Sequence, residues 1–259
     1  MVSEAFARVS LAGRVITITG GAGGIGSAAA KLCAARGAAV VVADLDDRAG
    51  EALVADIQQR GGQASYIRTD VTCESEVKKM VDFAVACYGK LDGAFNNAGI
   101  GDSNAPLADL STPSWQKHLD VNLSALFYCM KYQIPQMLEH GCGAILNTAS
   151  ASGMVGNPAA SHYVASKHGA VGVSKAAALD YAAQGIRVNA LLPGAVETPM
   201  ALAAFARAPE VKTAIEQGHP IGRLAQTSEI AEAAAWLLSD AASFITGAAI
   251  VVDGAYTTQ

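Results

Sequence analysis

The 259-residue chain has no excess of basic residues, since 18 lysines and arginines stand against 23 aspartates and glutamates, a formal net charge of −5. Nucleic-acid-binding proteins usually carry a basic patch, and polybasic membrane-surface proteins need clustered cations. The composition argues against both classes. Charged residues make up only 16% of the chain and hydrophobic residues 51%, which argues against disorder. The length suits one large α/β domain or two small ones.

Long apolar runs and paired cysteines are also missing. No stretch approaches the roughly 20 apolar residues that cross a bilayer, and residues 1–12 lack the apolar run of a signal peptide. The five cysteines are odd in number and contain no CxxC pair, so they predict neither a zinc site nor a redox motif. No cluster of histidine, cysteine and carboxylate residues has ligand spacing, so we predict no metal. These absences indicate a cytoplasmic protein with free thiols.

What the sequence does contain is an alternation of short apolar runs and longer amphipathic segments. The runs are apolar throughout, as expected for strands covered on both faces, and strands that alternate with helices predict a parallel sheet with right-handed crossovers. We therefore predict one α/β domain over residues 1–259, a doubly wound Rossmann-type fold with a mostly parallel seven-stranded sheet and helices on both faces. The predicted strands are 14–19, 39–43, 65–69, 91–95, 144–148, 187–192 and 249–252. The predicted helices are 24–36, 46–60, 74–88, 114–139 (disturbed near Pro135), 161–184 and 227–238 (with Thr227 or Ser228 as N-cap).

A glycine-rich loop lies between the first predicted strand and the first predicted helix. Gly20, Gly24 and Gly26 allow a tight turn and close approach of the backbone to a diphosphate, and the following helix supplies free N–H groups. The second strand ends at Asp44, where an acid hydrogen-bonds the ribose hydroxyls of NAD and repels the 2′-phosphate of NADP. The loop and the acid favour NAD, and the alternative is that Asp44 caps the next helix.

Asp70 ends the third strand, where it is placed to meet the adenine of a dinucleotide. The competing interpretation makes Asp70 or Thr72 the N-cap of the following helix.

Tyr163 and Lys167 are spaced i, i+4 near the start of a predicted helix, so they share one face. An ammonium beside a phenol lowers the tyrosine pKa from about 10, which makes an acid/base usable near neutral pH. Ser150 and Asn97 lie just past strands, and Asn122 stands inside a predicted helix, where asparagine is a poor residue. Because the carboxyl ends of parallel strands meet at one crevice, we expect these side chains to converge there.

These residues resemble the short-chain dehydrogenase/reductase family over nearly the whole chain. The matching segments are the TGxxxGxG loop (19–26), NNAG (96–99), Asn122, Ser150, YVASK (163–167) and Pro193-Gly194, in the family's order and spacing. The family's loop often has a hydroxyl or basic residue before its second fingerprint glycine, whereas this chain has Gly23 at that position. That departure removes one NADP anchor. The segments LDGAFNNA, FYCMKYQI, RVNALLPGAVETPM and HPIGRLAQ look most like bacterial NAD-dependent cyclic-alcohol and cyclohexadienediol dehydrogenases.

The resemblance implies roles for particular residues. Tyr163 would exchange a proton with the substrate oxygen, and Lys167 would lower its pKa and bind the nicotinamide ribose. Ser150 would orient the substrate oxygen, and Asn122 would hold a water that links Lys167 to solvent. The implied cofactor contacts are Gly20, Gly24, Ile25, Gly26, Asp44, Leu45, Asp70, Val71, Asn97, Ala98, Gly99, Tyr163, Lys167, Pro193, Gly194, Val196 and Thr198.

The expected activity is interconversion of a small, fairly apolar, cyclic secondary alcohol or diol and its ketone, with NAD as cofactor. Residues 197–219 are expected to form a substrate lid, and the resemblance implies a homotetramer. His162 is expected at the pocket edge or surface, and His219 to be structural or exposed. The alternatives are a ketone reductase of steroids, sugars or 3-oxoacyl thioesters, and a non-catalytic NAD-sensing or scaffold protein on the same fold.

Overall fold

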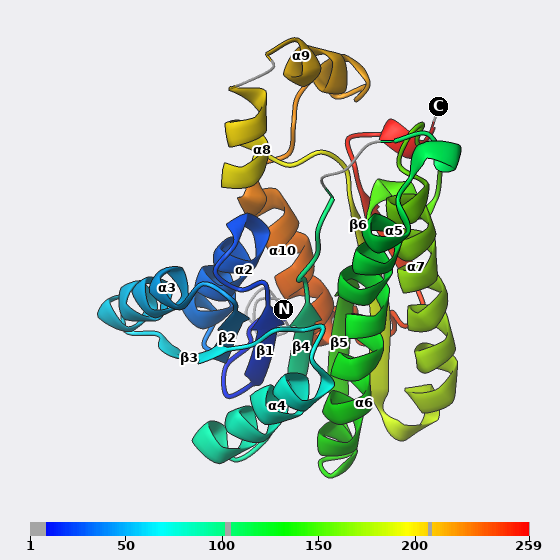
Figure 1. Cartoon of the computed structure of the whole chain (residues 1–259). Helices are drawn as coiled ribbons and strands as arrows, with labels where there is room; N and C mark the ends of the chain where they lie inside the picture. The colour runs from blue at the N-terminus through cyan, green and yellow to red at the C-terminus, as the bar shows by residue number, and fades with distance from the viewer. Residues whose placement is uncertain (1–8, 102–104, 207–208, 259) are drawn as a thin grey trace.

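The computed structural model describes residues 9–101, 105–206 and 209–258, and its centre is one parallel sheet of seven strands (Figure 1). The strand order is β3-β2-β1-β4-β5-β6-β7, and every neighbouring pair is parallel. This architecture confirms the predicted doubly wound α/β fold. The strands are β1 (Val15–Thr19), β2 (Ala39–Asp44), β3 (Gln63–Arg68), β4 (Gly93–Asn96), β5 (Gly143–Thr148), β6 (Ile186–Pro193) and β7 (Ala249–Val252).

Helices cover both faces of the sheet. The principal helices are α2 (Gly24–Ala35), α3 (Asp47–Gln59), α4 (Glu74–Tyr88), α5 (Thr112–Leu119), α6 (Ala125–Leu138), α7 (Ser161–Tyr181), α8 (Pro199–Phe205), α9 (Pro209–Gln217) and α10 (Thr227–Leu238). No helix among the described residues is both long and apolar enough to span a membrane.

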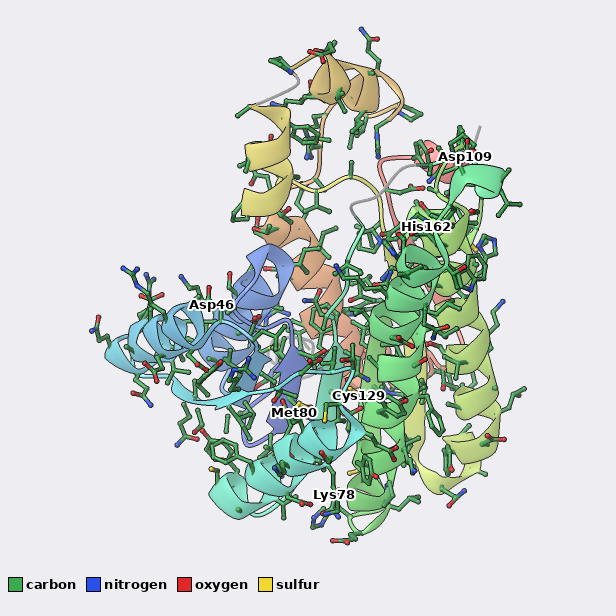
Figure 2. The ribbon with its side chains drawn as sticks, viewed as in Figure 1. Asp46, Lys78, Met80, Asp109, Cys129 and His162 are labelled. Carbon is green, nitrogen blue, oxygen red and sulfur yellow. The ribbon has the colours of Figure 1, made fainter. Side chains whose placement is uncertain are left out.

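Two apolar layers hold the helices to the sheet. Successive side chains of a strand point to opposite faces and therefore belong to opposite layers. Val40 and Val42 of β2 belong to the apolar layer that includes side chains of α2, α3 and α10, whereas Val41 belongs to the layer that includes side chains of α4, α6 and α7. Met80 of α4 and Cys129 of α6 belong to this second layer (Figure 2). Each fully buried valine contributes about 1.5–3 kcal/mol, which explains why β2, a strand covered on both faces, is apolar on both of them. All five cysteines are free thiols, as predicted.

The predicted long helix 114–139 is interrupted, but at a different place from the one predicted. A π-helical turn, Asp120–Ser124, separates α5 from α6, whereas α6 continues through Pro135. The disturbance therefore lies at Asn122, and π-turns inside helices are frequent at functional sites.

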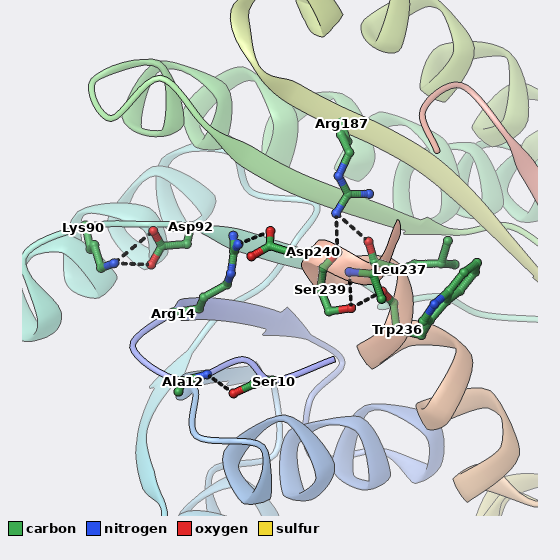
Figure 3. Close-up of polar contacts among 11 residues, drawn as sticks. Ser10, Ala12, Arg14, Lys90, Asp92, Arg187, Trp236, Leu237, Ser239 and Asp240 are labelled. Atoms are coloured by element: carbon green, nitrogen blue, oxygen red, sulfur yellow. Dashed lines mark hydrogen bonds and ion pairs between the residues drawn. The ribbon is translucent and has the colours of Figure 1, made fainter. Parts of the chain in front are cut away.

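Helix α10 begins as predicted at Thr227, but its N-cap is Gln226, not Thr227 or Ser228. Gln226 and Glu229 form a capping box, each side chain accepting the other's backbone N–H. At the other end, the guanidinium of Arg187 on β6 donates to the carbonyl oxygens of Leu237 at 2.9 Å and Ser239 at 3.1 Å (Figure 3). Arg187 thereby satisfies carbonyls that the last turn of the helix leaves without partners.

The segment 197–219 contains α8 and α9, which lie at the top of Figure 1, beyond the start of α2. Its base is joined to the body by a short parallel bridge between Val196 and Ala225. Leu202 on α8 is 46% exposed, so an apolar side chain of this segment faces outward rather than into the core.

Candidate active site

The glycine-rich loop passes from β1 into α2 with its backbone packed tightly upon itself. Gly20 has φ +60°, and a Cβ added there would lie 2.9 Å from the Cα of Ala98. A Cβ on Gly26 would lie 2.1 Å from the carbonyl oxygen of Gly20, and one on Gly24 would lie 2.9 Å from the Thr198 side chain. These close approaches allow only glycine. They also bring Thr198, from far along the chain, against the loop.

The start of α2 has no side-chain cap. Its N-cap, Gly23, provides no side-chain hydrogen bond. The first-turn N–H groups of a helix have no intrahelical partner and carry partial positive charge, so they suit a phosphate. The donor set at this end of β1 therefore fits the diphosphate of a dinucleotide.

Asp44 is tied to this loop by its side chain. One carboxylate oxygen accepts the Ala22 N–H at 2.9 Å, and the other accepts the Leu45 N–H at 2.7 Å and the Asp46 N–H at 3.2 Å. The N-cap of α3 is Asp46, whose side chain accepts the Ala49 N–H and which stands at the start of that helix in Figure 2. The alternative that Asp44 caps α3 is therefore wrong.

Asp70 lies two residues past the end of β3, close to where it was predicted, and it does not cap α4. Its carboxylate accepts the N–H of Thr72 at 2.9 Å and the Thr72 hydroxyl at 2.7 Å. The N-cap residue of α4 is Cys73. The capping alternatives for Asp70 and Thr72 are therefore wrong, and the two residues instead close a turn between β3 and α4.

The NNAG segment is pinned to the end of β1. The hydroxyl of Thr19 accepts the N–H groups of Asn97 at 3.0 Å and Ala98 at 3.2 Å. The amide of Asn97 donates to the carbonyl oxygens of Thr19 at 3.2 Å and Gly20 at 3.3 Å. The strand end that carries the glycine loop and the strand end that carries NNAG are thus a single unit.

Asn122 occupies the π-helical turn and is 1% exposed. Its side chain accepts the Ile100 N–H at 2.9 Å, donates to the Ile100 carbonyl at 2.9 Å and donates to the Ser166 hydroxyl at 3.2 Å. A Cβ on Gly99 would lie 3.1 Å from the Asn122 Oδ1 and 3.3 Å from the Lys167 Nζ. Asn122 therefore holds the segment after NNAG directly beside the lysine.

Ser150, Tyr163 and Lys167 converge as predicted. Lys167 is 3% exposed, donates from Nζ to the Thr148 carbonyl at 3.1 Å and lies 5.6 Å from the centre of the Tyr163 ring. Burial lowers the pKa of Lys167 to about 8. A Cβ on Gly101 would lie 3.0 Å from the Tyr163 ring, so the chain passes close over the phenol.

The pKa of Tyr163 is raised in this structure, not lowered as the sequence predicts. Burial raises it, and a hydrogen bond with Ser150 works in the opposite direction. Burial disfavours the phenolate, and Lys167 is directed at Thr148 rather than at the phenol. The spacing of the two residues predicted that they meet, but it carried no information on how dry their surroundings are.

The remaining predicted cofactor residues lie around this centre. Ile25 is in the first turn of α2, Leu45 is 53% exposed beside Asp44, and Val71 is 9% exposed. Pro193 ends β6, and Gly194 through Thr198 form the loop that follows it. The carboxyl ends of β1, β2, β4, β5 and β6 lie side by side at one edge of the sheet, which is where this fold binds its ligands.

One histidine, His162, departs from expectation, whereas His219 fits it. His162 is 1% exposed, rather than at the pocket edge or surface, and its ring lies 3.9 Å from the ring of His118 on α5 (Figure 2 labels His162 near the top of α7). His219 is buried, as a structural residue, and contacts the loop after Gly194. Sequence reasoning gave neither histidine a partner, because both partners come from distant segments. No group of three or more histidine, cysteine or carboxylate residues in the described ranges is arranged to hold a metal ion.

A family model described as enoyl-(acyl carrier protein) reductase matches residues 20–257. The chain is 49% identical over 248 residues to a 2,5-dichloro-2,5-cyclohexadiene-1,4-diol dehydrogenase of Sphingobium indicum, covering 95% of this chain and 98% of that protein. It is 47% identical to a cyclohexanol dehydrogenase of an Acinetobacter species, over 95% of this chain and 96% of that one. Among solved structures, an actinorhodin polyketide ketoreductase variant with NADPH superposes with a TM-score of 0.90 at 34% identity, covering 95% of this chain and 98% of that one.

Proposed function

Since the chain belongs to the short-chain dehydrogenase/reductase family, an oxidoreductase family that acts on secondary alcohols with a nicotinamide cofactor, we propose that it oxidises a small cyclic alcohol or diol with NAD. The observation that carries this proposal is the convergence of Ser150, Tyr163 and Lys167 at the carboxyl edge of the sheet, beside Asp44 and the glycine loop. A serine, a phenol and a buried ammonium at one site can bind an alcohol oxygen and move its proton.

The chain's own residues handle the substrate oxygen and its proton. The Ser150 hydroxyl holds the alcohol oxygen, and the Tyr163 phenolate accepts the alcohol proton and becomes the phenol while the C–H bond is broken. In this proposal the Lys167 ammonium, 5.6 Å from the centre of the Tyr163 ring, stabilises the phenolate electrostatically and so acts against burial, which raises the Tyr163 pKa. Asn122 positions the Gly99–Ile100 backbone beside Lys167. We also propose that Asn122 holds a water molecule through which Lys167 exchanges protons with solvent. The nicotinamide supplies the hydride acceptor in oxidation, or the donor in reduction.

The choice of NAD rests on Asp44. Its carboxylate lies at the end of β2 and is fixed to the Ala22 N–H of the glycine loop. A fixed carboxylate with a lone pair still available accepts a hydrogen bond from the ribose hydroxyls and repels a 2′-phosphate. We assign the remaining contacts to the cofactor as the resemblance implies, with Asp70 and Val71 at the adenine, Asn97 to Gly99 behind the nicotinamide, and Val196 and Thr198 at the carboxamide.

The substrate class is proposed from the relatives and from the segment 197–219. The relatives are named for cyclohexanol and for a chlorinated cyclohexadienediol. We propose that α8 and α9 form a lid that covers such a ring. Leu202 on α8 and Val211 on α9 are exposed apolar side chains of this segment, and the Met200 side chain lies outside the described residues. The Thr198–Gly24 contact joins the base of the lid to the cofactor loop.

Two further parts of the proposal concern the state of the protein. Exposed apolar side chains on α6 and α7, such as Phe127 at 52% and Leu179 at 85%, support self-association into the expected homotetramer. Light scattering after size-exclusion chromatography measures the mass directly. The cytoplasmic location stays a prediction.

The testing experiment measures turnover with NAD and then NADP against cyclohexanol, a cis-cyclohexanediol, a sugar and a steroid alcohol. Tyr163→Phe should lower kcat by about 10²–10⁴-fold, the range for a general acid/base. Tyr181→Phe makes the same chemical change at the other end of α7 and should leave kcat unchanged. Turnover of a cyclic alcohol by the wild type, lost only in Tyr163→Phe, supports the proposal. Equal activity of Tyr163→Phe contradicts it.

A ketone reductase is the second candidate, and the likeness to the NADPH-bound ketoreductase favours it. Measuring both directions with each cofactor distinguishes the two, since a reductase would show higher kcat/KM for ketone and NADPH. Tight NAD binding without turnover of any substrate would instead favour the non-catalytic alternative.

A further inference from the structure

His219 joins two segments that the sequence separates. It follows the end of α9 and is 6% exposed. Its Nδ1 donates to the Ile215 carbonyl at 2.7 Å, four residues back, and its Nε2 accepts the Ala195 N–H at 3.1 Å. A carbonyl can only accept and a backbone N–H can only donate, so these partners fix the proton on Nδ1 and leave Nε2 as the acceptor.

The imidazole lies directly against the loop after β6. A Cβ added to Gly194 would lie 2.8 Å from the His219 Nε2, so this position has room only for glycine. His219, Ala195 and Ile221 are among the residues that line a partly open pocket of about 110 Å³. Because the space around Ala195 is not filled, packing alone does not fix the loop there, and the hydrogen bond to His219 acts as its restraint.

A second set of contacts links the imidazole to Ser150, on the substrate side of the site. The His219 ring stacks on Tyr256, with centroids 4.9 Å apart and planes 25° apart. The Tyr256 hydroxyl donates to Asn157 at 3.0 Å, and Asn157 donates to the Ser152 hydroxyl at 2.6 Å. The Ser152 N–H donates to the Ser150 hydroxyl at 3.1 Å.

We propose that His219 is a positioning residue which, through Ala195 on one side and Tyr256 on the other, fixes the nicotinamide-binding loop relative to Ser150. This inference rests on the proposed function, because that function places the cofactor at Gly194 to Thr198. His219 touches neither the substrate nor the reacting atoms in this arrangement. It sets the distance between the loop after β6 and the loop after β5, and errors of about 1 Å in such distances are costly to catalysis.

The local geometry offers matched variants. His219→Gln keeps an acceptor where Nε2 lies, whereas His219→Phe keeps the ring that stacks on Tyr256 but has neither nitrogen. His168 on α7 makes the same bond from Nδ1 to the carbonyl four residues back, at 3.0 Å, and is exposed. His168→Phe therefore controls for loss of that local bond alone.

The first measurement is hydrogen exchange of segment 194–198 in the protein without cofactor. Loss of one hydrogen bond should speed exchange at Ala195 by about three- to tenfold in His219→Phe. Exchange in His219→Gln should stay within about twofold of wild type. Unchanged exchange in His219→Phe would overturn the inference, and this readout does not depend on the proposed function.

The second measurement is the dissociation constant of NAD, by calorimetry, together with kcat and KM. His219→Phe should weaken NAD binding about three- to tenfold, with rescue by His219→Gln and no change in His168→Phe. A residue with only a structural role would lower the melting temperature without this rescue. Equal NAD affinity in His219→Phe and wild type would overturn the inference, whereas a wild type that binds neither NAD nor NADP would overturn the proposed function.

Tyr256→Phe tests the link to Ser150. It removes the hydroxyl that donates to Asn157 but keeps the ring stacked on His219. It should lower kcat by about threefold with the NAD dissociation constant unchanged. Unaltered kcat and KM for the alcohol would overturn this half of the inference.

Discussion

Replacing Asp44 with alanine should convert the cofactor preference from NAD toward NADP. The lost carboxylate would accept charge-assisted hydrogen bonds from the ribose, worth about 1.5–3 kcal/mol, or roughly 10–100-fold in the NAD KM. A 2′-phosphate carries a charge of about −1.5 to −2, and unit charges about 5 Å apart repel by about 3 kcal/mol at an effective dielectric constant of about 20. Asp44 is half-buried, so screening reduces this repulsion to about 1–2 kcal/mol. The ratio of kcat/KM for NAD over NADP should therefore fall by about 10²–10³-fold.

The same substitution has a calculable effect on stability. Of the three N–H groups that bind Asp44, those of Leu45 and Asp46 belong to exposed residues and can be hydrated, whereas Ala22 is half-buried. Loss of the Ala22 bond should cost about 1–2 kcal/mol. For a chain of this length that lowers the melting temperature by about 2–8 °C. The protein should remain folded, so the change in cofactor preference can be measured.

The assay compares initial rates with NAD and NADP for the wild type, Asp44→Ala and Asp46→Asn. Asp46→Asn removes one negative charge two residues away and keeps an N-cap of similar quality, so its ratio should stay within about threefold of wild type. A wild type that prefers NADP, or an Asp44→Ala ratio equal to that of Asp46→Asn, would refute the reasoning from the ribose.

Three other predictions concern single positions. Burial holds the pKa of Lys167 at about 8, below its usual 10.5. Between these values the unfolded chain binds more protons, so the wild type gains stability as pH rises from about 8 to 10.5. Lys167→Met should therefore have a higher free energy of unfolding than the wild type at pH 7, by roughly 3 kcal/mol at most. Urea unfolding should show this difference shrinking by pH 10, and a difference that does not change with pH would contradict the lowered pKa. Gly99→Ala places a Cβ 3.1 Å from the Asn122 Oδ1 and 3.3 Å from the Lys167 Nζ, so kcat should fall about tenfold with little change in melting temperature, and normal kinetics would show that the backbone can move aside. Arg187→Met leaves the carbonyls at the end of α10 without their donor, which should cost about 2–4 kcal/mol of stability by thermal unfolding while kcat per folded molecule stays the same.

Most of the fold could be predicted from the sequence because its signals are local. Apolar runs and the glycines that end them predicted α4 and β7 with the ends that the structure has, and the alternation of strands and helices predicted the parallel sheet. The segments that differ are those where a distant contact decides the outcome. The break in the helix lies at Asn122 rather than at Pro135, because the Asn122 amide pairs with Ile100 and Ser166.

The residues of the candidate site were also predictable, because they stand at strand ends or at helical spacing. Their environment was not. The spacing of Tyr163 and Lys167 predicted a lowered tyrosine pKa, whereas burial raises it. Desolvation depends on everything packed around a group, including segments that come together only in the folded chain.

The sequence by itself determined the family, the dinucleotide loop and which polar residues stand at the carboxyl ends of the strands. These features depend only on residue type and short spacing. Only the tertiary structure decided that Asp44 binds Ala22, that Gly24 meets Thr198 and that His219 joins Ala195 to Tyr256. Each of these contacts links segments that lie far apart along the chain or on different elements. Their formation depends on the closure of the whole sheet and its loops, which no local pattern encodes.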